Sequence, residues 1–210
     1  MPAPQAHWAL SFIHTMHEVA QPSRSAVSVN QPTAEAPRPV FLYDLASPLC
    51  WLAAEEVGGG PTWQPVSLQD LNGDAYAALA HADRDVVAAR APMPPRWPDP
   101  YPADSRTAML AAAFARKSGR VVAYSLAAFR QAFAGAKDLG DVDNVLIAAA
   151  ACELHPRALL AGLELRSTRE ELDAGTALAR ERGVSDLPAL VTGDAVAIGL
   201  DAVTNAAAAI

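Results

Sequence analysis

The chain has 210 residues, of which 51% are apolar, and its 16 basic and 23 acidic side chains give a formal net charge of −7. This length suits one domain, or one domain that carries an insertion. Binding to phosphate backbones or to anionic membrane surfaces requires clustered Lys and Arg, which this acidic sequence lacks. We therefore expect no nucleic-acid partner and no membrane association.

The two cysteines, Cys50 and Cys152, lie far apart in the sequence. They form neither a CxxC pair nor a zinc-binding spacing, so we expect no disulfide framework and no metal site. A reducing, cytoplasmic location is the simplest expectation. The sequence also lacks an apolar run of the roughly 18 residues that crosses a bilayer.

Residues 1–38 contain Pro, Ser, Asn and Gln too densely for a packed element, so we predict a disordered N-terminal extension outside the fold. The domain is predicted to span residues 39–210. Its first element is the apolar run 40–43, which is typical of a strand buried on both faces. Ser47 is a good N-cap and Pro48 suits the first helical position, so a helix should begin here.

That helix should end at the glycines that follow Val57, and a second strand is predicted at 62–66. Pro65 favours an edge strand or a strand end. Residues 71–182 are predicted to be helical except for the proline-rich loop 92–103. The predicted helices run over 105–117, 126–133 and 142–153, then from Pro156 and from Ser167.

Ser167 and Glu170 match the capping box that begins a helix, and Gly183 should end this helix. A β-hairpin is predicted over 187–192 and 195–198, followed by a final alanine-rich helix. These elements predict an α/β fold in which one sheet has helices on both faces.

Ser47 lies where the free N–H groups and the dipole of a helix N-terminus converge. A thiolate is stabilised at such a position, whether it belongs to the protein or to a ligand. The alternative is that Ser47 only caps the helix. Cys50, one turn further on, is either a reactive thiol near this site or an inert buried cysteine, and Cys152 is expected to be buried and inert.

Pro188 opens a predicted strand, where a cis peptide bond is a recurrent feature. Such a bend leaves the backbone of Leu187 free to pair with an extended, peptide-like ligand. Proline also begins strands for purely structural reasons.

These motifs together resemble one family. Residues 40–53, 183–189 and 197–201 are similar to the corresponding segments of kappa-class glutathione transferases and of 2-hydroxychromene-2-carboxylate isomerases. Both groups belong to the DsbA-like branch of the thioredoxin superfamily. The loop 95–102 is similar to a proline-rich stretch of the isomerases, and the resemblance spans about residues 39–205. It implies a thioredoxin-like fold with an all-helical insertion at about 71–180, between the N-terminal strand-helix-strand unit and the C-terminal β-hairpin and helix.

On this resemblance Ser47 is the catalytic serine that holds the thiolate of glutathione or of another small thiol. Leu187 offers backbone hydrogen bonds to the thiol compound, Pro188 is the cis-proline, and Asp201 takes the γ-glutamyl amino group. The resemblance further places Pro48, Trp51 and Leu200 along the glutathione site. In the isomerases the thiolate adds reversibly to a conjugated alkene, permits bond rotation and leaves, so the expected substrate is a conjugated or aromatic small molecule.

Three departures from the family pattern matter. Leu200 stands where kappa-class enzymes have a serine, the pair Ser185-Asp186 replaces a smaller pair, and the family's Asn and Lys find no counterpart in residues 67–90. A thiol-dependent isomerase or transferase is the leading prediction. A DsbA-like thiol-disulfide oxidoreductase that uses Cys50 and a non-catalytic binding domain are the alternatives, and a homodimer is expected because relatives are often dimers.

Overall fold

The computed structural model describes residues 38–210, so the predicted N-terminal extension falls outside the described residues apart from Arg38. The elements are β1 (Val40–Tyr43), α1 (Pro48–Val57), β2 (Thr62–Pro65), α2 (Leu68–Asn72), the 3-10 helix η1 (Gly73–Ala75), α3 (Tyr76–Arg90), α4 (Arg106–Lys117), α5 (Val121–Phe133), α6 (Val142–Ala150), α7 (Pro156–Leu163), α8 (Arg166–Glu181), β3 (Ala189–Thr192), β4 (Ala195–Ile198) and α9 (Leu200–Ala208).

Within this part of the chain the strands form one mixed sheet in the order β2-β1-β3-β4. β1 pairs in parallel with β2, which is possible because α1 makes the crossover, and β3 is antiparallel to both of its neighbours. The central strand β1 is buried, as its continuous apolar run predicts. Pro65 is the last residue of β2, an edge strand, and both positions agree with the prediction made from this proline.

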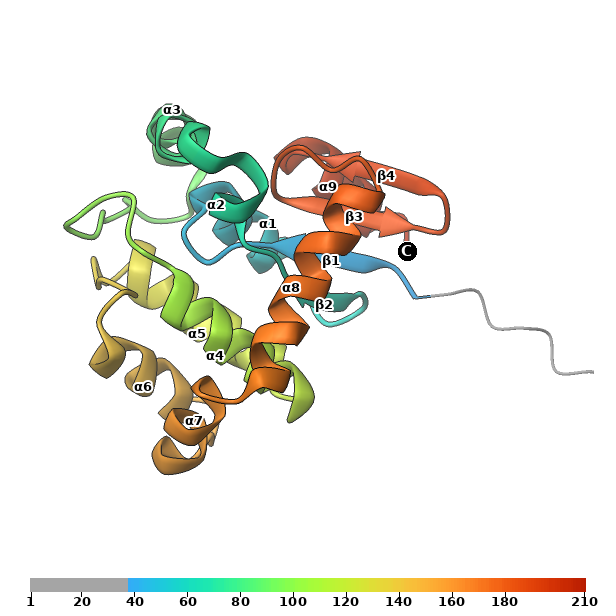
Figure 1. Ribbon diagram of the computed structural model, residues 1–210. Coiled ribbons are helices and arrows are strands. Elements are labelled where there is room, and N and C mark those ends of the chain that lie inside the picture. The colour runs from blue at the N-terminus through green and yellow to red at the C-terminus, as the bar shows by residue number, and fades with distance from the viewer. Residues whose placement is uncertain (1–37) are drawn as a thin grey trace, which may run out of the picture. The chain divides into compact units, whose positions relative to one another are not determined.

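Helices cover both faces of the sheet, as Figure 1 shows: α8 crosses one face, and α1 and α9 pack together on the other. Helices α4 to α7 form a separate bundle beside the sheet, with α4 and α8 contacting β2. Buried side chains from the sheet and from the bundle belong to one continuous core. The predicted α/β fold with a helical insertion is therefore confirmed.

Two predicted helix starts are wrong. Helix α5 begins at Val121 rather than at residue 126, because Gly119 closes the preceding turn with a positive φ of 69°. Helix α8 begins at Arg166 with Leu165 as its N-cap, so Ser167 is not a cap. Glu170 does not complete a capping box, because its carboxylate binds Arg166 one turn earlier at 2.7 Å.

Candidate functional site

The predicted corner between β1 and α1 is present. Ser47 is the N-cap of α1, and its Oγ accepts a hydrogen bond from the N–H of Cys50 at 3.2 Å. Pro48 follows at the first helical position and is buried. The Ser47 N–H donates to the Asp44 carbonyl at 3.1 Å, so both the backbone and the side chain of Ser47 are hydrogen-bonded within this turn.

A buried carboxylate holds the corner together. Oδ1 of Asp44 accepts hydrogen bonds from the Ala46 N–H at 2.8 Å and from the Ser105 hydroxyl at 2.9 Å, and Oδ2 accepts from the Leu68 N–H at 2.7 Å. Burial raises the pKa of Asp44, and these three hydrogen bonds oppose the rise. Asp44 thus joins the β1–α1 turn to the first turn of α2 and to the N-cap of α4. No pattern in the sequence marked Asp44 for this role.

Cys50 is fully buried beneath Ser47. Burial raises the pKa of its thiol far above the usual range, and hydrogen bonds from the Ser47 side chain and the Asp44 backbone only partly oppose this. Cys152 is also buried, its thiol donates to the Ala149 carbonyl at 3.1 Å, and burial raises its pKa too. Neither cysteine is therefore a ready thiolate at neutral pH.

The segment before β3 has the predicted bend. The Leu187–Pro188 peptide bond is cis, and the Pro188 carbonyl accepts a hydrogen bond from Gly199 at 2.8 Å. The N–H of Leu187 is already engaged, because it donates to Oδ1 of Asp186 at 2.8 Å. A ligand that pairs with Leu187 must therefore bind the Leu187 carbonyl oxygen or displace the Asp186 side chain from the Leu187 N–H.

Leu200 and Asp201 lie at the start of α9. The Asp201 carboxylate is largely exposed and forms an ion pair with Arg90 at 2.6 Å. Leu200 is buried and lines a hollow together with Leu52 and Glu56 of α1. Because α1 rises about 1.5 Å per residue, this hollow is roughly 8–14 Å along the helix from Ser47. An extended ligand is needed to reach both ends.

Trp51 packs inside the molecule. It is 2% exposed, and its ring stacks on Phe133 of α5 at a centroid distance of 5.7 Å. The side chain thus connects α1 to the helical bundle.

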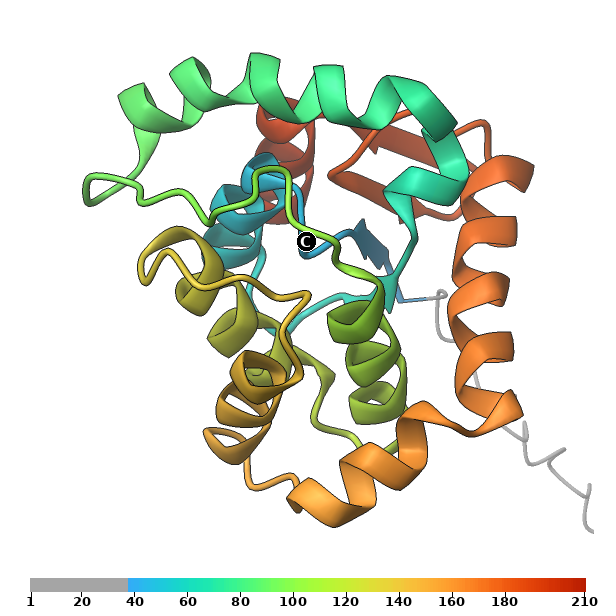
Figure 2. The ribbon, with the colours of Figure 1, turned by 60° about the vertical axis from the view of Figure 1, so that its left-hand side comes forward.

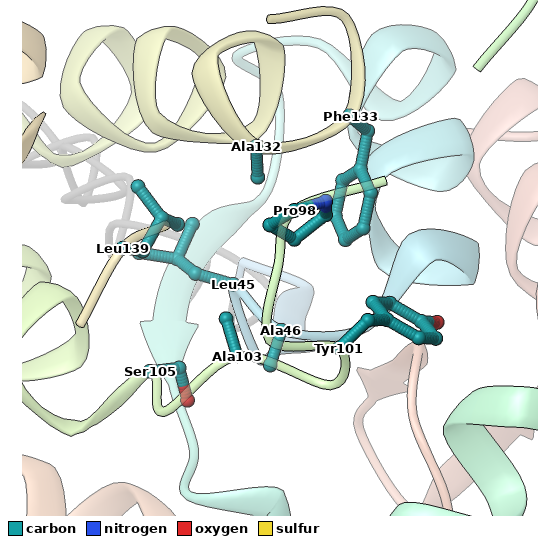
Figure 3. Close-up of a pocket in the computed structure, with 9 residues that line it drawn as sticks. All are labelled: Leu45, Ala46, Pro98, Tyr101, Ala103, Ser105, Ala132, Phe133 and Leu139. Carbon is teal, nitrogen blue, oxygen red and sulfur yellow. The ribbon is translucent and has the colours of Figure 1, made fainter. Parts of the chain in front are cut away.

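A small hollow lies beside the corner, between the sheet side of the molecule and the helical bundle (Figure 3). The residues that line it are Leu45, Ala46, Pro98, Tyr101, Ala103, Ser105, Ala132, Phe133 and Leu139. Its free space is about 10 Å³, which accommodates no more than about one water molecule. The lining is almost wholly apolar, so if the hollow widened it would suit an apolar or aromatic group.

Two acidic residues near the corner were not identified from the sequence as interacting. Burial raises the pKa of Asp83 on α3 to about 6, and the negative charge of Asp186 raises it further in the same direction. Burial also raises the pKa of Asp186. The segment that leads to Leu187 therefore carries negative charge close to that of Asp83. Asp83 and Asp186 lie far apart in the sequence, so no local pattern predicted that they interact.

In residues 38–210 no group of three or more His, Cys, Asp or Glu side chains is arranged to hold a metal ion. No helix in the same range has the length and apolar character to cross a membrane.

Comparison with known families assigns the fold. Residues 62–210, more than half of the chain, match the DSBA-like thioredoxin domain. The chain belongs to this family. The matched part begins at β2, so it includes the Leu187–Pro188 bend but not the Ser47 corner. Comparison with curated proteins gives no match.

Solved structures with the same fold include enzymes of two kinds. A 2-hydroxychromene-2-carboxylate isomerase is similar with a TM-score of 0.68 and 18% identity, over 81% of this chain and 93% of the isomerase. A probable DsbA oxidoreductase from Streptomyces coelicolor is similar with a TM-score of 0.63 and 18% identity, over 82% of this chain and 88% of that protein. At this identity the similarity shows a shared thioredoxin-like fold.

Proposed function

We propose that the protein is a thiol-dependent isomerase or transferase of the 2-hydroxychromene-2-carboxylate isomerase type. One observation carries the proposal: Ser47 caps α1 at the N-terminal corner where a thiolate is stabilised, whereas both cysteines are buried with raised thiol pKa values. The reactive thiol is therefore supplied by a ligand, glutathione or another small thiol.

The corner carries the groups that stabilise the sulfur anion of such a ligand. Ser47 Oγ accepts from the Cys50 N–H, and its O–H, which also faces the Cys50 thiol, can turn to donate to the thiolate of a ligand. The N-terminal end of α1 adds a partial positive charge. When bound, the small thiol supplies the nucleophile that adds to a conjugated alkene and later leaves it. Ser47 then holds the sulfur in its anionic form before addition and after departure.

The remaining residues favour particular parts of the ligand and substrate. Asp201 carries an exposed carboxylate suited to an ammonium group, provided that this group replaces Arg90. The lining beside Ala46 and Phe133 is apolar, which suits a conjugated or aromatic substrate once the roughly 10 Å³ hollow widens.

The decisive experiment compares Ser47→Ala with Cys50→Ala in glutathione-dependent isomerisation of 2-hydroxychromene-2-carboxylate. We expect Ser47→Ala to lower kcat/KM by about 100-fold, which corresponds to the loss of one hydrogen bond to a developing charge. Cys50→Ala should keep most of the activity. Calorimetry with glutathione and with cysteine then identifies the thiol. Equal activity of wild type and Ser47→Ala would contradict the proposal.

A thiol-disulfide oxidoreductase is the second candidate, because one structural relative is named as a probable DsbA oxidoreductase. That reaction here needs Cys50 as a lone nucleophile. It therefore predicts rapid alkylation of Cys50 by iodoacetamide in the folded protein, which its complete burial opposes. If no thiol binds and Cys50 stays unmodified, a non-catalytic binding domain is favoured instead.

A further inference from the structure

An irregular segment joins α3 to α4 and runs past α1, as Figure 2 shows. We call residues 92–103 the strap. It contains six prolines and has no helix or strand of its own. A connection of this length without secondary structure is often an active-site lid or a binding loop.

The strap covers the Ser47 corner. Pro98, Tyr101 and Ala103 form one wall of the small hollow, directly opposite residues that precede Ser47 in the β1–α1 turn (Figure 3). Ser47 itself is only 2% exposed. With the strap in this position, a thiol compound and its substrate have no room at the corner.

Few backbone hydrogen bonds hold the strap. Its six prolines have no N–H to donate. In the part of the chain that the structure describes, Arg96 is the one strap residue whose N–H donates to a backbone carbonyl, that of Phe133 at 2.7 Å. The strap can therefore move away without breaking a ladder of backbone hydrogen bonds.

Side chains hold the strap instead. The Arg84 guanidinium on α3 lies 4.6 Å from the ring centre of Trp97 and 5.2 Å from that of Tyr101. The Tyr101 hydroxyl donates to the Ala80 carbonyl at 2.7 Å, and the Trp97 ring packs edge-on against Phe133 at 6.1 Å. Arg84 is thus the one cation that contacts both aromatic rings of the strap among the described residues.

We propose that the strap is a lid over the Ser47 corner and that Arg84 is its latch. Opening breaks the contacts of Arg84 with two rings, the edge-on contact of Trp97 with Phe133 and the backbone bond of Arg96. It also breaks two hydroxyl bonds, from Tyr101 to the Ala80 carbonyl and from Tyr76 to the Ala103 carbonyl. It joins the small hollow to solvent and exposes the N-terminal end of α1. That this corner is the ligand site comes from the proposed function, on which the inference rests, whereas the movement itself is testable without any ligand.

Trypsin provides the first test, because the Arg96–Trp97 bond lies within the strap and the Phe133 carbonyl holds the Arg96 N–H, so opening of the strap should speed cleavage. Arg84→Ala leaves that bond unchanged in sequence. We expect Arg84→Ala to raise the cleavage rate at Arg96 about tenfold, because it removes a partly desolvated cation–π contact. Arg84→Lys keeps the charge but not the planar stacking, so its rate should be intermediate.

Arg120→Ala is the matched control. Arg120 also forms one surface contact, an ion pair with Glu153 at 3.2 Å, but it caps the N-terminus of α5, whereas the strap contacts Phe133 at the opposite end of this helix. Its cleavage rate at Arg96 should equal that of wild type. Thermal unfolding of each variant separates a local opening from a general loss of stability.

The second test places a probe at the corner. In a Ser47→Cys, Cys50→Ala double variant, which avoids creating a C-x-x-C pair, the new thiol should react with Ellman's reagent much more slowly than a free thiol, with peptide mapping to distinguish it from Cys152. Adding Arg84→Ala should raise that rate about tenfold, and adding Arg120→Ala should not change it. Labelling at the free-thiol rate with the strap intact, or unchanged rates in both tests, overturns the lid even if Ser47→Ala abolishes catalysis.

Discussion

At the residue scale, the position of Ser47 depends on the carboxylate of Asp44. Three donors from three separate segments point at its two oxygens inside the core. A shift of any one segment breaks a buried hydrogen bond, which costs more than the bond contributes when made. Asp44 is therefore a positioning residue for the corner.

Replacing Asp44 by Asn tests this role. One amide oxygen and one NH₂ group cannot accept from all three donors, so at least one buried donor loses its partner. We expect the free energy of unfolding to fall by about 1–3 kcal/mol in urea titrations. Ser105→Ala, which removes a single donor, should cost less. Equal and negligible effects of both substitutions would argue against a structural role for the carboxylate.

The pKa of Asp83 makes a pH-dependent prediction. Its folded-state pKa of about 6 lies above the unfolded value, so the folded protein binds more protons between about pH 4 and 6. The free energy of unfolding should therefore fall as pH rises through this window and level off above it.

The size of this effect is limited because Asp83 is only half-buried. Asp83→Asn should reduce the slope, to which the raised pKa values of Asp44 and Asp186 also contribute, and stabilise the protein at pH 7 by at most about 1 kcal/mol. Asp85→Asn, an exposed neighbour on α3, should leave the slope in place. An NMR titration of the Asp83 carboxyl carbon measures the pKa directly, and a midpoint near 4 would refute the prediction.

At the scale of elements, local signals predicted the start of α1 but not that of α8. Ser47 and Pro48 are adjacent, and together they are sufficient for a helix start. The signal at Ser167 failed because Thr168, the next residue, is completely buried. Packing therefore places this whole turn inside the helix and overrides the cap.

The close approach of α8 to β2 could not be predicted from sequence, and it depends on Gly175. A Cβ at this position would collide with the Pro65 carbonyl and the Gln64 side chain. We expect Gly175→Ala to lower the free energy of unfolding by about 2 kcal/mol, since overpacking outweighs the gain in helix propensity.

The control is Asp173→Ala on the exposed face of the same helix. It raises helix propensity without adding a buried atom, so it should be neutral or slightly stabilising. Urea titrations of both variants decide the matter. If Gly175→Ala is as stable as the control, the contact between α8 and β2 is looser than described.

At the scale of the whole molecule, the order of strands and helices was readable from the sequence because each element carries its own apolar pattern. The arrangement around the site was not. The pairing of Arg84 with Trp97 and Tyr101 joins segments that no local pattern connects. The same fold also supports an isomerase and a probable oxidoreductase among its structural relatives, so function has to be argued from the residues of the corner.

The sheet and the helical bundle should unfold together, because their core is continuous. Tyr43 of β1 shares a 2.6 Å hydrogen bond with Ser125 of α5, and its ring lies 5.9 Å from that of Phe129. Both hydroxyls are buried, so separating the two parts exposes a large apolar surface and leaves two polar groups unpaired.

We therefore expect one cooperative transition in urea, with tryptophan fluorescence, from Trp51, Trp63 and Trp97, and far-UV circular dichroism from the helices giving the same midpoint. The measurement is best made in a Trp8→Phe background, because Trp8 lies outside the described residues. Ser125→Ala should lower the free energy of unfolding by about 1 kcal/mol while keeping the two signals coincident, because the loss falls on a contact that both parts share. The exposed Ser118→Ala should change neither quantity. Two separate midpoints in the wild-type chain would mean that the bundle folds independently, in which case opening between bundle and sheet, rather than movement of the strap, would control access to Ser47.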